Sequence, residues 1–497
     1  MPITGILPAL ELDIAMNRQR HNLVAKVIDG DELRRACEKI IEATRSNDAK
    51  KVRRYLNRFS QDVLRVCTLP GPEGYSAVTS AAEHGHVDIL RLLSEANVPL
   101  HWNDEHGWTA LHLGALRAHE AVVRFLIECK VNLDYKNREG WTALHVAVRK
   151  GQEVIVRTLI NAKANANAVG PEGWSALHLA AAAGRRDIVD VIMKGRAGWH
   201  RANPHVQNSH GATPMYVACQ NGHSAVVEAF VGTMEAITTR QRHGWGPIHV
   251  AAANGHTQVL AVLLNNSAFV DFQTRNGETA LYLASQNGHS DVVMLLLKSL
   301  ANAELATRDD WTPVMVASSC GQTAVVKALL DSGRVSINSQ NSDGDTALHL
   351  AAAGNSRDTV ALLVQRGADV DRKNNQGQSA IFAPAKKDFR AVVEELIGAE
   401  CDLDLQDANG MTCAHVTAMQ NRDRVLQLLI NQKVQLDLQD AAGRTPVHVA
   451  ALHGSRECLV ILNVAGCDVY QHTSDGFTPI YLAAQNGHKK VGFTLRV

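Results

Sequence analysis

Apolar residues recur along this chain in pairs of short segments, and polar stretches rich in Gly, Asn and Asp separate one pair from the next. The segment REGWTALHVAVRKGQEVIVRTLI, residues 138–160, is typical. Its first apolar run ends near a Gly, and its second places apolar residues three and four positions apart, which is the spacing of one helix face. The pattern predicts two short helices, a Gly break between them and a polar turn after the second.

The pattern repeats at a nearly fixed period. A Gly opens most units, and the period of about 33 residues is one that short helical repeats adopt. The interval from Gly173 to Gly211 is five positions longer, and Asp310 takes the Gly position in the unit before Gly344. Thirteen units result, opening at Gly74, Gly107, Gly140, Gly173, Gly211, Gly244, Gly277, Asp310, Gly344, Gly377, Gly410, Gly443 and Gly476. Such a period indicates a stack of small structural repeats.

The first helix of each unit has a recognisable start. In most units Thr or Ser stands two residues after the opening position, where its hydroxyl can accept a hydrogen bond from a free backbone N–H. Pro follows in several units, where its missing N–H costs nothing. Small residues then share one face of the helix, as at Ala180 and Ala181, and they permit close helix packing.

Stretches such as DEHGWTALHLGA, GWSALHLAAAAGRRDIVDVI and DGDTALHLAAAGN resemble the ankyrin repeat, and the resemblance covers residues 69–497. It implies an all-α fold, an ankyrin-repeat solenoid of stacked helix-turn-helix units with β-hairpin or loop tips. It also implies that the His of the motif hydrogen-bonds its own Thr and neighbouring backbone. We therefore interpret this His as structural, at His112, His145, His178, His249, His349, His415 and His448.

Domain boundaries follow from where the repeat is clear. We expect a helical segment of unknown role at 1–37, a degenerate capping repeat at 38–68 and the array of 13 units at 69–497. The array is expected to be irregular at 195–211 and weak at 377–400, because Pro384 would lie inside a first helix and remove a backbone hydrogen bond. The sequence stops within a second helix, so a further repeat or domain is expected beyond Val497.

Composition excludes several classes of function. Lys plus Arg equal Asp plus Glu at 50 each, which disfavours nucleic-acid binding, and the apolar runs are too short for membrane insertion. Nine Cys without a C-x-x-C pair favour reduced thiols in the cytoplasm, with the nucleus as the alternative. We expect a monomer with no cofactor. No metal site is expected either, since the candidate ligands His200, His205 and His210 recur at intervals of five, which fits no helix face.

No phosphate-binding loop, dinucleotide fingerprint, nucleophile elbow or H-E-x-x-H motif occurs, so no catalytic residue is predicted. The leading interpretation is a non-enzymatic scaffold or adaptor that binds a partner protein along its concave face. The alternative is a regulatory or targeting arm of a larger receptor, channel or ubiquitin-ligase type protein. An enzyme within these residues is the least favoured class, because a solenoid offers no deep pocket.

Five of the seven Trp directly follow the opening position of a unit: Trp108, Trp141, Trp174, Trp245 and Trp311. Two interpretations stay open, since these rings could stiffen the row of tips or anchor a partner. Charges near this slot complete the predicted partner surface: Arg117, Arg138, Glu139, Arg149 and Lys150. The surface would suit an extended or helical segment with apolar and acidic residues. The basic run at Lys50, Lys51, Arg53, Arg54 and Arg58 could extend it.

The family resemblance also suggests a modification. Asn167 and Asn338 take the tip position that an oxygen-sensing asparaginyl hydroxylase modifies in many ankyrin-like proteins. Leu159 and Leu330 match the upstream preference of that enzyme, whereas Asn165 and Ser336 replace the usual acidic residue. Hydroxylation of Asn167 and Asn338 is therefore a hypothesis, and intact-peptide mass spectrometry after coexpression would test it.

Overall fold

The computed structural model describes residues 31–59, 63–68, 70, 74–195, 202–232, 237–241 and 243–490. Residues 1–30 of the predicted N-terminal segment, residues 196–201 of the predicted irregular segment and the last seven residues lie outside this description. The chain divides into two compact units, Met1–Pro247 and Ile248–Val497.

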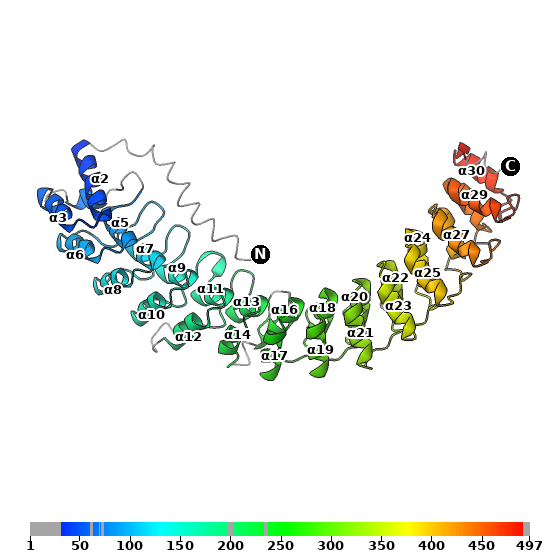
Figure 1. Ribbon diagram of the computed structural model, residues 1–497, viewed down its shortest axis with the longest axis horizontal. Coiled ribbons are helices and arrows are strands. Elements are labelled where there is room, and N and C mark those ends of the chain that lie inside the picture. Colours follow the sequence, from blue (N-terminus) through cyan, green and yellow to red (C-terminus); the bar gives the residue numbers. More distant parts are fainter. Residues whose placement is uncertain are drawn as a thin grey trace. The chain divides into compact units, whose positions relative to one another are not determined.

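The first unit is a series of helix pairs in which first helices pack on first helices and second helices on second helices (Figure 1). Its helices are α2 (Asp31–Arg45), α3 (Ala49–Arg58), α4 (Val63–Thr68), α5 (Ala77–His84), α6 (Val87–Glu95), α7 (Ala110–Arg117), α8 (Glu120–Glu128), α9 (Ala143–Arg149), α10 (Glu153–Asn161), the 3₁₀ turn η4 (Pro171–Gly173), α11 (Ala176–Ala182), α12 (Arg186–Lys194), α13 (Pro214–Gln220) and α14 (Ser224–Phe230).

The second unit has the same pattern, with α16 beginning at the boundary residue. Its helices are α16 (Pro247–Ala253), α17 (Thr257–Asn265), α18 (Ala280–Asn287), α19 (Ser290–Lys298), α20 (Pro313–Ser319), α21 (Thr323–Asp331), α22 (Ala347–Ala353), α23 (Arg357–Gln365), α24 (Phe382–Lys387), α25 (Arg390–Gly398), α26 (Cys413–Met419), α27 (Asp423–Asn431), α28 (Pro446–His453), α29 (Arg456–Val464) and α30 (Pro479–Gln485). The predicted all-α fold is confirmed.

The tips between helix pairs are loops. In the described residues β structure is limited to two isolated bridges, Asn103 with Thr109 and Val169 with Ser175, both in the first unit. At the N-terminal end, α2 and α3 form a pair that packs on α5 and α6 as later pairs do. α2 runs through the predicted boundary at residue 38, because its apolar face continues on both sides of it: Ala36, Cys37, Ile40 and Ile41 are all buried.

Where a repeat carries the motif His, this side chain joins it to the next repeat. In α9 the Nδ1 atom of His145 lies 2.8 Å from Thr142 Oγ1 and accepts from the Thr142 backbone N–H, so the Nε2–H donates to the Ala168 carbonyl at 3.0 Å. The predicted bonds to the motif Thr or Ser and to neighbouring backbone are confirmed for six of the seven His residues, whereas His249 has Gly246 at the Thr position. The other motif His residues reach carbonyls in the same way, His112 to Trp141, His178 to Ala212, His249 to Phe272, His349 to Gln378, His415 to Arg444 and His448 to Gln471.

A second set of side chains crosses between repeats at the start of the second helix. The Nε2 atom of His119 lies 2.9 Å from the Glu83 carbonyl, and that of His223 lies 3.1 Å from the Ala182 carbonyl. Where His is replaced, Gln152 donates to the Leu116 carbonyl instead. Neighbouring repeats are therefore connected by directional bonds as well as by apolar packing.

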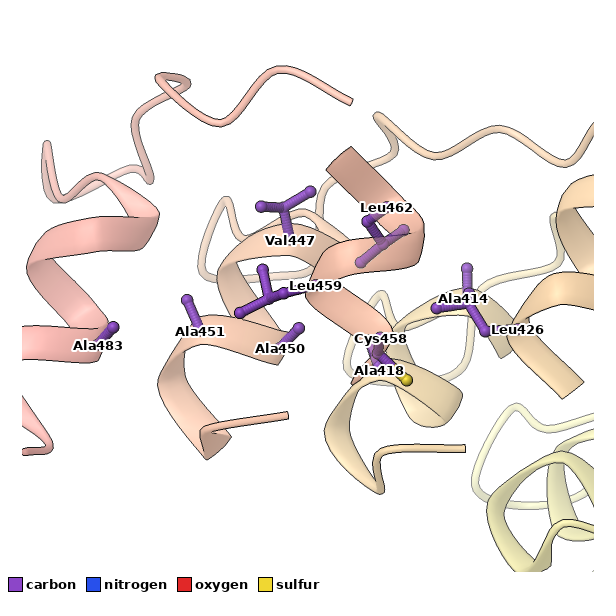
Figure 2. Close-up of a cluster of buried hydrophobic side chains, with 10 residues drawn as sticks. All are labelled: Ala414, Ala418, Leu426, Val447, Ala450, Ala451, Cys458, Leu459, Leu462 and Ala483. Carbon is purple, nitrogen blue, oxygen red and sulfur yellow. The ribbon is translucent and has the colours of Figure 1, made fainter. Parts of the chain in front are cut away.

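Within each unit the apolar core is a layer between helix pairs, and Figure 2 shows one section of it. The small side chains of first helices lie against the large side chains of second helices, which lets the backbones approach closely. The members of this section come from α26 to α30: Ala414, Ala418, Leu426, Val447, Ala450, Ala451, Cys458, Leu459, Leu462 and Ala483.

Pro384 does not break a helix, contrary to the expectation that it would remove a backbone bond. α24 begins only at Phe382, two residues later than the equivalent helices, so Pro384 falls in its first turn, where a missing N–H leaves no bond unmade. The delayed start leaves the buried Ser379 hydroxyl without a hydrogen-bond partner, because Phe382 occupies the position of the motif His. The same repeat holds Asp388 at φ 64°, with one carboxylate oxygen buried and unbonded.

We expect the repeat at 377–400 to open more readily than its neighbours. It lacks the hydrogen bonds that the motif Thr and His make with each other and with the next repeat. An unbonded buried polar group costs about 1–3 kcal/mol. Native-state hydrogen exchange should show α24 and α25 exchanging at least tenfold faster than α22 and α26. Equal protection in all four helices would contradict the prediction.

Candidate partner-binding surface

The Trp slot is built by the tip that precedes each first helix. The backbone N–H of Trp141 donates to Asn137 Oδ1 at 2.8 Å, and the Asn137 N–H donates to the Trp141 carbonyl at 2.9 Å. Asp104 holds Trp108 with the same pair of bonds, at 2.7 and 2.9 Å. Each ring then lies beside the motif His four residues later, with centroids 5.4 Å apart for Trp141 and His145.

The five Trp rings are not equally accessible. Trp108 is 5% exposed, whereas the other four are half-buried. The ring of Trp141 also packs on the next tip, since a Cβ added to Gly170 would lie 2.5 Å from its Cζ3 atom. This contact fits the stiffening interpretation that the sequence left open, and it covers only part of the half-buried Trp141 ring.

Two of the rings border a shallow recess at the end of α9. It is lined by Trp108, Leu116, Trp141, His145, Val146, Arg149 and Lys150. Its volume is about 20 Å³, little more than one water molecule needs, so it can take an apolar side-chain tip but not a metabolite. Four predicted partner residues therefore meet here, and Leu116 and Val146 are additions that the sequence did not suggest.

Positive charge surrounds this recess. The guanidinium carbon of Arg149 lies 5.9 Å from the centroid of the Trp141 ring, within the range of a cation–π contact. Burial lowers the pKa of Arg149, and the Glu139 carboxylate acts in the opposite direction, so the group stays charged near neutral pH. Lys150 is exposed beside it. The recess thus combines an apolar floor with two cations at its edge.

The remaining predicted residues are placed differently. Arg117 is engaged by Glu83, with Nη2 3.0 Å from Oε1. Arg138 and Glu139 are exposed on a tip, where the Arg138 N–H donates to the His106 carbonyl at 2.9 Å. Trp174, Trp245 and Trp311 do not line the recess.

Sequence reasoning passed over two aromatic residues. Trp102 is 41% exposed and Tyr135 36% exposed, on successive tips, and the Asn103 side-chain amide donates to the Tyr135 hydroxyl. Both stand five residues before the opening Gly of the following unit, so a search of each repeat position for aromatic residues would have found them.

The motif His residues have no free nitrogen for catalysis. Burial lowers the pKa of His112, His145 and His178 to about 4, which makes them neutral at physiological pH, and both ring nitrogens are used in structural bonds. The structural hydrogen bonds of these His residues therefore set their protonation state and tautomer.

Asn167 and Asn338, the two predicted hydroxylation sites, connect successive tips. Each side-chain oxygen accepts the backbone N–H of the next loop, from Asn203 at 2.7 Å and from Asp369 at 2.9 Å. Asp134 and Asp371 make the same bond elsewhere. Hydroxylation at these two residues stays a prediction.

Within the described ranges, no group of three or more His, Cys, Asp or Glu side chains could hold a metal ion. The part of the chain that the structure describes also contains no helix long and apolar enough to cross a membrane.

Comparison with known proteins gives one consistent result. A family model described as "Ankyrin repeats (3 copies)" matches in overlapping segments at residues 40–137, 129–200, 196–274, 249–341, 297–374, 333–407 and 381–471. Among solved structures, the chain is similar to the ankyrin repeat domain of Bcl-3, a member of the IκB protein family. That similarity has 27% sequence identity and a TM-score of 0.42, and it covers 46% of this chain and 100% of the Bcl-3 chain.

Proposed function

This chain belongs to the ankyrin-repeat family, and on that premise we propose that it is a non-enzymatic scaffold that binds a partner protein at the recess between Trp108 and Trp141. Ankyrin repeats are non-catalytic modules for protein–protein interaction. The observation that carries the proposal is the recess itself, where aromatic and aliphatic groups meet two cations.

The chemistry of the recess defines the partner. An apolar side chain would fill the space between the rings, and a neighbouring carboxylate would pair with Arg149 or Lys150. The partner is therefore an extended or helical segment in which an acidic residue stands close to an apolar one. All nine cysteines are free thiols, which fits a monomer working in the reducing cytoplasm or nucleus. The same surface would serve a free-standing adaptor or the targeting arm of a larger protein.

A charge variant tests the recess. Affinity capture from cell lysate should lose a specific partner when Arg149→Gln and Lys150→Glu are combined, because a close charge pair across an interface contributes about 1.5 kcal/mol or more. With the captured partner purified, its Kd should rise at least tenfold. The matched control combines Lys130→Gln with Lys163→Glu, which changes the net charge by the same amount at two exposed lysines outside the recess.

Two Trp variants separate anchoring from stiffening. Trp141 and Trp174 occupy the same slot, but only Trp141 lines the recess. Trp141→Ala should lower the affinity for the partner more than Trp174→Ala does. The thermal stability of both variants is measured before their affinities are compared. Equal binding by the two variants, together with full binding by the charge variant, would remove the recess from consideration.

A further inference from the structure

The helix α3 presents a dense basic surface that the recess does not use. Val52 and Leu56 are buried and attach α3 to its neighbours α2 and α6. The other face exposes five cationic side chains within ten residues: Lys50, Lys51, Arg53, Arg54 and Arg58.

This charge arrangement is unfavourable for an isolated helix. α3 contains no acidic residue, and Lys50 and Lys51 stand in its first turn, next to the positive end of the helix dipole. Lys50, Arg54 and Arg58 follow one another at intervals of four, so like charges are neighbours along the surface. Unfavourable charge placement of this kind, without acidic residues on the same helix to compensate it, is typical of a functional surface.

Four second helices elsewhere in the array pair an arginine with an acidic residue four positions away. In α8, for example, Arg124 pairs with Glu120, four residues earlier. The same i,i+4 compensation occurs in α10, α12 and α25, as Arg157–Glu153, Arg186–Asp190 and Arg390–Glu394. α3 is the second helix of its pair, and it departs from this pattern.

Neighbouring charges leave most of the α3 surface unneutralised. Asp48 caps the helix, accepting the Lys51 N–H at 2.9 Å and pairing with Lys51 Nζ at 3.5 Å. The guanidinium of Arg58 lies 5.3 Å from the Phe59 ring centroid. On the elements packed against α3, the exposed charges are Arg34, Arg35, Glu38, Lys39 and Glu42 of α2 and Asp88, Arg91 and Glu95 of α6. Among the described residues, Lys50, Arg53 and Arg54 have no carboxylate within ion-pair distance.

We propose that the exposed face of α3 binds an extended polypeptide segment with acidic residues at alternate positions. A rise of about 1.5 Å per residue places Lys50, Arg54 and Arg58 about 6 Å apart along the helix. Alternate side chains of an extended chain are about 6.6 Å apart on one face. Three carboxylates of such a segment therefore align with these three cations, and its charge relieves their repulsion.

A membrane surface fits this helix less well. A helix that lies on a membrane inserts apolar residues, whereas the exposed positions of α3 hold only Lys, Arg and Asn. The site is separate from the recess at α9. Arg149→Gln with Lys150→Glu should leave binding at α3 unchanged, so the two proposals succeed or fail independently.

The test uses the full chain and a fluorescein-labelled peptide of alternating Glu and Ser. Fluorescence anisotropy should show binding that weakens with added salt, and a peptide with the same residues in a Glu block followed by a Ser block should bind less tightly. Combining Lys50→Glu, Arg54→Glu and Arg58→Glu should lower affinity at least tenfold. The matched control, Lys130→Glu, Lys163→Glu and Lys327→Glu, makes the same change in net charge on other repeats and should retain binding.

Three results would overturn the proposal. They are absence of peptide binding, equal loss in the α3 and control variants, and equal affinity for the alternating and block peptides. Sedimentation with vesicles of phosphatidylcholine and phosphatidylserine at a ratio of 7:3 adds a fourth, since binding to vesicles but not to peptide would assign α3 to a membrane surface. If the charge-reversal variant does not fold, the variant with Gln at the same three positions replaces it.

Discussion

Lowering the pH from 7 to 5 should lower the free energy of unfolding of the first unit by about 6 kcal/mol, because the contributions of three buried histidines add. Burial lowers the pKa of His112, His145 and His178 from 6.5 to about 4. Between these pKa values the unfolded chain binds protons that the folded chain excludes, so stability falls as pH falls. At pH 5 the effect is about 2 kcal/mol for each His.

The sign and the window are both testable. Above about pH 7 the three His residues should not change the stability of the first unit. The loss of stability should grow from pH 6.5 downward and should stop growing below about pH 4. Burial also lowers the pKa of His349, His415 and His448, so the second unit should respond in the same direction. Hydrogen exchange in α7, α9 and α11, measured at pH 7 and pH 5 and corrected for intrinsic rates, follows the effect repeat by repeat.

A His variant provides the control. His145→Gln keeps an N–H donor for the Ala168 carbonyl but cannot be protonated, so it should be less stable at pH 7 and yet lose about 2 kcal/mol less on acidification. Stability that is the same at pH 7 and pH 5 in the unaltered chain would show that these His residues do not exclude protons.

Gly184→Ala should destabilise the repeats on either side of it by about 2–3 kcal/mol, because backbone strain and a steric clash add together. Gly184 adopts φ +67°, where a Cβ costs about 1–2 kcal/mol. An added Cβ would also lie 2.6 Å from Nδ1 of His223, displacing the ring that hydrogen-bonds the Ala182 carbonyl. Urea denaturation followed by circular dichroism should show a lower midpoint.

The opposite change at the equivalent position of another repeat serves as the matched comparison. Ala118 ends α7 at φ 66° and is exposed, so Ala118→Gly relieves the strain of the left-handed conformation and should stabilise by about 0.5–1 kcal/mol. A lower midpoint for Ala118→Gly, or an unchanged one for Gly184→Ala, would show that left-handed strain does not control this turn.

The sequence by itself determined the repeat, the helix starts and the role of the motif His. These features depend on residues a few positions apart: Thr142 caps the helix three residues before His145, and apolar residues at helical spacing mark the buried face. Such signals act within one repeat and recur in most of the thirteen units, so the copies reinforce the same prediction. Pro384 misled the prediction because a helix start can move by two residues to accommodate it.

Only the tertiary structure decided which candidate side chains are available. Trp108 and Trp141 share one slot, yet Trp108 is 5% exposed and Trp141 is half-buried, with its ring against Gly170 of the next tip. Arg117 is held by Glu83, which belongs to the preceding repeat, and no local pattern indicates that pair. Long side chains on a repeat surface adopt conformations set by the adjacent repeat. The composition of a surface can therefore be predicted from the sequence, whereas its recesses and unneutralised charges depend on packing between repeats.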